Sequence, residues 1–113
     1  MAKESPTVAQ ACEAYMTSLQ EGRYYDAHED LEALWFPRRF EKDAEVNLWK
    51  GFINAAVCFE LIKKGRPIPS QTAWKTYLKY VVVLDALETE HNHIYVTMVE
   101  FILQQRGKIC PIS

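Results

Sequence analysis

A chain of 113 residues with 49% hydrophobic and 25% charged residues has the composition of an ordinary globular protein, so we expect one domain spanning residues 1–113. Its formal net charge of -2 excludes a whole-molecule field that would attract nucleic acid or a membrane surface. The cysteines Cys12, Cys58 and Cys110 lack disulfide-like pairing, and no apolar run suits a signal peptide or a membrane span. These features predict a cytoplasmic protein with free thiols.

The first predicted helix follows Ser5, a candidate N-cap, with Pro6 at the first helical position. Apolar residues then recur at helical spacing at Val8, Cys12, Tyr15, Met16 and Leu19. The helix should end at Gly22, since glycine adopts the left-handed conformation that terminates many helices.

The second predicted helix, residues 24–36, carries acid and base groups on its apolar side. At about 100° per residue, an apolar arc holds His28 inside it and Glu32 at its margin. An imidazole and a carboxylate four residues apart can meet on one face. Pro37 ends this helix.

The third predicted helix, residues 44–64, is apolar around most of its circumference, which indicates a central helix or one shared with another subunit. A breaker at 65–69 precedes a fourth helix capped by Ser70, whose apolar face includes Asp85. Charged residues at 88–93 precede a last helix ending near Gly107. This order predicts an all-α, antiparallel bundle of about five helices, with Trp49, Trp74, Tyr24 and Tyr25 in its core.

Two segments carry a family resemblance. Gly22, the pair Tyr24-Tyr25 and the run His28-Glu29-x-x-Glu32-x-x-Trp35 resemble the signature of the domain-of-unknown-function 309 family, small helical proteins of bacteria and archaea. Residues 51–56 are similar to that family's Gly-Leu-Ile-Gln-x-Ala segment, with Asn54 where the family usually has Gln. The resemblance covers roughly residues 22–65 and implies a helical fold, while the family name records no function.

The candidate site residues are His28, Glu29, Glu32, Trp35, Asn54 and Asp85. In one interpretation the His28–Glu32 pair is structural and orients its helix against the third. In the other, His28 lines a small pocket as a general base or a metal ligand, with Glu29 at its rim. Because buried polar groups need partners, we expect Asn54 to reach His28 or Glu32, and Asp85 to bond the start of the last helix or the same cluster.

Neither a catalytic residue nor a metal site is assigned, and the cofactor is unknown. Glu32 stands where the zinc-protease motif His-Glu-x-x-His has its second histidine, which leaves too few nitrogen ligands for zinc. The Glu-x-x-His pairs at 88–91 and 90–93 overlap at one helix end, so they cannot supply the facing helices of a di-metal site.

Charge is unevenly distributed along the chain. Residues 1–32 hold seven acids, whereas no acid lies between Glu60 and Asp85, a stretch with five basic residues. Such faces help helices or subunits of opposite charge to meet, and no recognised fold supports a nucleic-acid site there. We therefore expect a non-enzymatic domain that self-associates through the third or fourth helix or binds a partner. The alternative is a small-molecule or metal-dependent enzyme or binding protein with a pocket at His28, Glu32 and Asn54.

Overall fold

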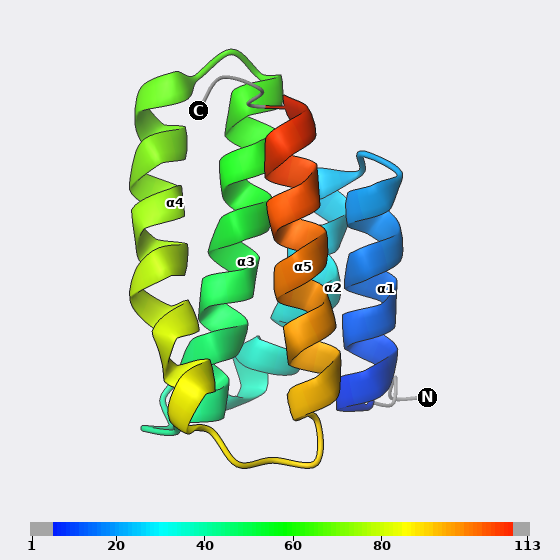
Figure 1. Cartoon of the computed structure of the whole chain (residues 1–113), viewed down its shortest axis with the longest axis vertical. Helices are drawn as coiled ribbons and strands as arrows, with labels where there is room; N and C mark the ends of the chain where they lie inside the picture. The colour runs from blue at the N-terminus through cyan, green and yellow to red at the C-terminus, as the bar shows by residue number, and fades with distance from the viewer. Residues whose placement is uncertain (1–5, 110–113) are drawn as a thin grey trace.

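A computed structural model describes residues 6–109 of the chain. This part contains five α-helices, which are α1 (Val8–Gln20), α2 (Tyr24–Trp35), α3 (Ala44–Lys63), α4 (Pro67–Val81) and α5 (Asn92–Ile109), and two short 3₁₀-helices, η1 (Phe36–Arg38) and η2 (Val82–Ala86). Consecutive α-helices run antiparallel (Figure 1). The predicted all-α bundle is confirmed.

Helix α1 begins later than predicted. Thr7 is its N-cap and forms a capping box with Gln10, in which each side chain accepts a hydrogen bond from the other residue's backbone N–H, at 3.1 and 3.0 Å. Pro6 precedes the helix, and Ser5 and Cys110 lie outside the described residues. The predicted start was wrong because only Thr7 has a glutamine three residues ahead. The end at Gly22, with φ +75°, is as predicted.

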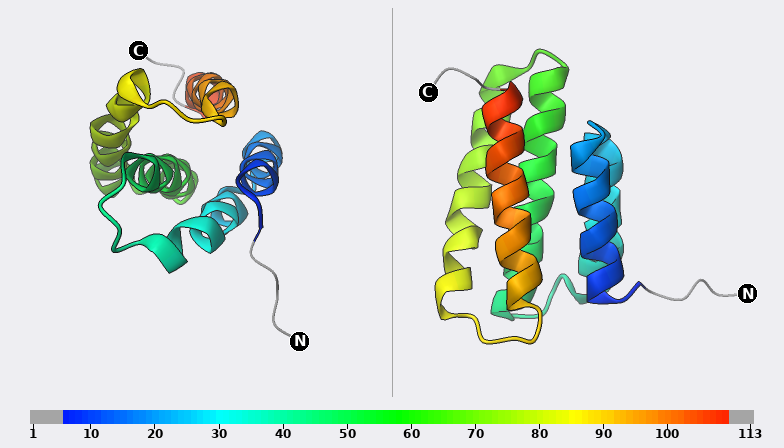
Figure 2. Two further views of the ribbon diagram at one scale, coloured as in Figure 1. Left: turned by 90° about the horizontal axis from the view of Figure 1, so that it is seen from below. Right: turned by 45° about the vertical axis from the view of Figure 1, so that its right-hand side comes forward.

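Helix α3 is the centre of the bundle, as its apolar circumference predicted. Asp43 caps it by accepting a hydrogen bond from the Glu45 backbone N–H at 2.7 Å. The helix contacts α2, α4 and α5, while α1 contacts α2 and α5. Seen along the bundle, α2, α4 and α5 lie around α3, and α4 and α5 stand apart from one another (Figure 2).

Helix α4 begins at Pro67, three residues before the predicted cap. Pro67 and Pro69 occupy the first turn, where the N–H that proline lacks has no intrahelical acceptor. Ser70 is buried inside this turn and donates its hydroxyl to the carbonyl of Pro67 at 2.6 Å. The prediction of Ser70 as N-cap was therefore wrong, because proline starts a helix as well as breaking one.

The core is organised around aromatic rings. Phe52 on α3 is fully buried, and its ring centroid lies 6.0–6.4 Å from the rings of Tyr15 on α1, Tyr77 on α4 and Tyr95 on α5. The Tyr15 hydroxyl donates to the Phe52 carbonyl at 2.6 Å. One side chain thus joins four helices.

Cys12 and Cys58 are buried, as their apolar positions predicted. Burial raises the pKa of Cys12 to about 12, since desolvation disfavours the thiolate, and the nearby Glu45 and Glu13 carboxylates add to this effect. The thiolate, which is the reactive form of cysteine, is therefore disfavoured at Cys12 at neutral pH.

Of the four aromatic residues expected in the core, Tyr25 lies outside it, whereas Trp74 packs against it at the edge. Trp49 and Tyr24 are buried, but Tyr25 is 57% exposed and Trp74 is half-buried.

Across residues 6–109, no helix combines the length and the apolar character needed to cross a membrane.

Candidate functional site

The His28–Glu32 pair forms within α2 as the spacing predicted. His28 Nε2 lies 2.9 Å from a Glu32 carboxylate oxygen, and the two side chains are 23% and 42% exposed. The Tyr25 ring lies beside His28, with centroids 5.7 Å apart. Trp35, one turn beyond Glu32, is partly buried against the core. The pair is a partly solvated contact between neighbouring turns of one helix.

Two hollows flank this motif. His28 lines one of about 220 Å³ with residues of α2 and α3, among them Tyr25, Val57 and Lys64. Glu29 and Glu32 line another, more open one of about 290 Å³ with Ala33 and Phe36. The candidate residues of α2 are thus divided between two shallow surfaces.

The other two candidates behave differently from expectation. Asn54 donates its side-chain amide to the carbonyl of Lys50, one turn back on its own helix, at 2.9 Å. Asp85 is exposed on η2, so its predicted burial was wrong. The regular helix stops at Val81, which changes the direction of every later side chain from the one that a continuous α-helix would give.

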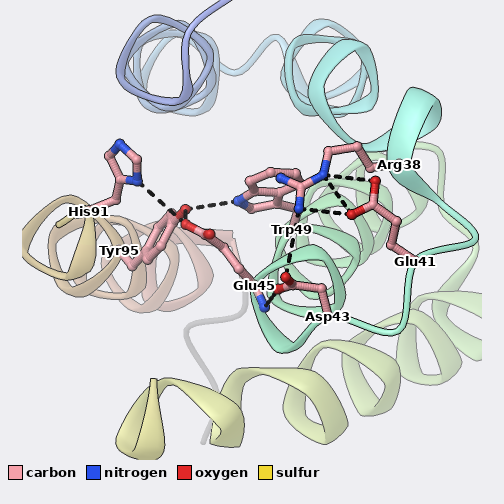
Figure 3. Close-up of polar contacts among 7 residues, drawn as sticks. All are labelled: Arg38, Glu41, Asp43, Glu45, Trp49, His91 and Tyr95. Carbon is pink, nitrogen blue, oxygen red and sulfur yellow. Dashed lines mark hydrogen bonds and ion pairs between the residues drawn. The ribbon is translucent and has the colours of Figure 1, made fainter. Parts of the chain in front are cut away.

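A buried polar network that the sequence did not reveal lies at one end of the bundle (Figure 3). The Trp49 indole N–H donates to the Tyr95 hydroxyl at 2.9 Å, and that hydroxyl donates to the Glu45 carboxylate. His91 Nδ1 lies 3.4 Å from the same carboxylate. Burial, and then the bond to Glu45, raise the pKa of Tyr95 far above its ordinary value. The network ties α3 to the start of α5.

Three charged residues continue this network toward the surface. Arg38 on η1 lies over the Trp49 ring, 5.2 Å from its centroid, and donates to the Glu41 carboxylate at 3.0–3.1 Å. These bonds raise the pKa of Arg38. Arg38 also lies 3.7 Å from Asp43, the cap of α3. The connection between α2 and α3 is thereby fastened to the same end of the bundle.

Replacing Tyr95 by phenylalanine is expected to lower the free energy of unfolding by about 1–2 kcal/mol, because the buried Trp49 N–H loses its acceptor. Chemical denaturation followed by tryptophan fluorescence measures the change. Tyr25→Phe is the matched control, since Tyr25 is exposed and should tolerate the same loss of a hydroxyl. Equal stability of the two variants would show that the network does not hold α5.

Over residues 6–109, no group of three or more His, Cys, Asp or Glu side chains is arranged to hold a metal ion. The network joins α3 to α5, and the His28–Glu32 pair is a contact within α2. Glu45 lies beside both Tyr95 and His91, and Arg38 lies beside both Glu41 and Asp43.

The comparison with known protein families covers the part of the chain that holds the α2 motif. A family model described as a domain of unknown function (DUF309) matches residues 12–78, more than half of the 113 residues. The chain belongs to the DUF309 family. No curated protein and no solved structure matches it. The DUF309 match includes α2, α3 and most of α4, and α5 lies beyond it.

A groove of about 660 Å³ lies between α4 and α5 of this DUF309 chain, and we call it the α4/α5 groove. Cys58 and Ile62 of α3 line it, with Trp74 and Leu78 on the α4 side and Arg106 on the α5 side. The views of Figure 2 show the two outer helices standing apart here. The volume lies in the range of ligand-binding clefts.

The charged side chains that line the α4/α5 groove are all positive. Its lining includes Lys75 and Arg106 and no acid. The Arg106 guanidinium lies 4.0 Å from the centroid of the Trp74 ring, and it has no carboxylate within 4 Å among the described residues. The groove thus offers an apolar surface and two cations to a ligand.

The sequence of α4 contains a signal for this groove. On α4, Trp74 and Leu78 lie to one side of the buried residues Ala73 and Tyr77. Since the core needs only one stripe per helix, a second apolar flank indicates a further contact. The prediction placed Trp74 in the core and did not distinguish these two flanks.

Proposed function

We propose that this protein is a non-enzymatic domain that self-associates, with the α4/α5 groove as one half of the interface. The observation that carries the proposal is the exposure of large apolar side chains on both sides of the groove. Leu78 is 46% exposed on α4 and Leu103 is 57% exposed on α5. At 100° per residue, Leu103 and Val99 lie on the same flank of α5 as Arg106, which lines the groove.

The distribution of exposed apolar residues supports this assignment. Five of the eight large exposed apolar side chains belong to α4, η2 and α5: Ile68, Leu78, Val82, Val96 and Leu103. Single exposed apolar residues are common. Of these five, Leu78 lines the groove, and Leu103 lies on the flank of α5 that carries Arg106. Burial of such side chains in a second copy would stabilise the assembly through the hydrophobic effect.

The His28–Glu32 motif has a structural part in this proposal. Its two side chains are partly exposed and already satisfy each other within α2. An ion pair of this kind contributes only a few tenths of a kcal/mol. We therefore expect His28→Ala to fold and to associate as the natural chain does.

The test is sedimentation velocity over a wide range of protein concentrations. The natural chain should show a mass that rises with concentration above its monomer mass of 13.1 kDa, and Leu103→Glu should remain monomeric. Thr97→Glu is the matched control, because Thr97 is exposed on another side of the same helix. A natural chain that stays monomeric, or a Leu103→Glu variant that associates equally well, would overturn the proposal.

A further inference from the structure

We infer that the α4/α5 groove receives the outer face of α2 from a second copy, so that chains associate head to tail. This inference rests on the proposed function and names the surface that fills the groove. The surface, which we call the α2 stripe, consists of Tyr25, Glu29, Glu32 and Phe36. These residues follow each other at intervals of four, three and four, which aligns them along one side of a helix.

The α2 stripe carries exposed aromatic rings and acidic side chains, and the groove lining has no acid. Tyr25 and Phe36 are 57% and 52% exposed, so each end of the stripe has a partly exposed aromatic ring, and the Arg39 guanidinium lies 3.6 Å from the centroid of the Phe36 ring. Between them stand two acids, of which Glu32 is shared with His28. Glu29 is exposed and has no ion-pair partner within 4 Å in the described part of the chain.

The charges of the two surfaces are complementary. The groove lining has two cations and no acid, whereas the α2 stripe has two acids, with one cation, the Arg39 guanidinium, against the Phe36 ring at its end. Groove-to-groove association would instead bring Lys75 and Arg106 of one copy toward those of the other. Opposite charges favour the α2 stripe as the partner surface, and like charges oppose a symmetric pairing of grooves.

The two surfaces also match in length. Tyr25 and Phe36 are eleven residues apart, as are Pro67 and Leu78 on the α4 wall of the groove. At a rise of about 1.5 Å per residue, each spans about 16 Å. A helix face of this length can lie along the groove with its aromatic ends over apolar walls and its acids beside the cations.

The positions of the surfaces determine the form of the assembly. Helix α2 lies on the other side of α3 from the opening between α4 and α5 (Figure 2). One chain can therefore fill a neighbour's groove while its own groove remains free. Contacts of this kind produce rings or open chains of subunits.

The experiment combines two variants that are each damaged on one surface only. Leu103→Glu keeps its α2 stripe, and the double variant Glu29→Lys with Phe36→Ser keeps its groove. All three positions are exposed, so both variants should fold, as circular dichroism can verify. Sedimentation velocity is then run on each variant alone and on their equimolar mixture.

Head-to-tail association predicts that each variant alone is monomeric, with a dissociation constant raised at least about tenfold, while the mixture forms a 1:1 dimer and nothing larger. Rising salt should dissociate that dimer, since ion pairs contribute to it. If the double variant alone associates like the natural chain while Leu103→Glu does not, the α2 stripe is overturned and the groove interface stands. A natural chain that remains monomeric overturns both proposals.

Discussion

The substitution Phe52→Ala is expected to lower the free energy of unfolding by about 3–5 kcal/mol, a large share of the stability of a small domain. Phe52 is fully buried, and its ring meets aromatic rings from α1, α4 and α5. Truncation leaves a cavity that three separate helices would have to close together. Such a site collapses poorly, so the cost should lie toward the upper end of this range.

Urea denaturation followed by circular dichroism measures the effect. Phe40→Ala is the control, because Phe40 is 85% exposed and the same truncation there should change stability by less than about 0.5 kcal/mol. A loss below about 1 kcal/mol for Phe52→Ala would contradict the position of this ring at the centre of the core.

The substitution Gly51→Ala is expected to destabilise the fold by about 2–3 kcal/mol, although alanine is the better helix former by about 1 kcal/mol. A Cβ atom at Gly51 would lie 2.9 Å from the Tyr80 Cβ and 3.6 Å from the Tyr77 carbonyl oxygen of α4. Neither atom is the flexible end of a side chain. The two helices would have to separate where they pack most closely.

Gly107→Ala is the control, and we expect this substitution to stabilise the fold rather than destabilise it. Gly107 lies in α5, is exposed, and has no atom within 4 Å of the position of an added Cβ. Helix propensity alone then applies, and the variant should gain up to about 1 kcal/mol. Thermal unfolding shows whether each variant has a lower or a higher melting temperature than the natural chain. Equal shifts for both would show that α3 and α4 do not meet closely at Gly51.

Local patterns predicted the helices and the His28–Glu32 contact because both depend on residues a few positions apart. The spacing of four residues in α2 sufficed to place the two side chains together. The start of α4 was missed because proline at 67 and 69 was read only as a breaker. The burial of Asp85 was wrong because the change from α-helix to η2 leaves no periodic signal.

The polar network and the groove could not be predicted in the same way, since both depend on contacts between distant segments. Glu45 and Tyr95 are fifty residues apart, and no short-range spacing brings them together. The groove exists because α4 and α5 both pack on α3 and leave a hollow between them. The sequence held the second apolar flank of α4, but only the arrangement of helices shows that this flank remains uncovered.

The antiparallel order of the helices also has a consequence for the timing of folding. Helices α1 to α4 each contact their neighbour in sequence, so these contacts close short loops and can form quickly. Helix α5 packs mainly on α1 and α3, and its contact with α1 requires a much longer loop to close. We therefore expect α5 to dock late in folding and to complete the groove after the rest of the bundle has assembled.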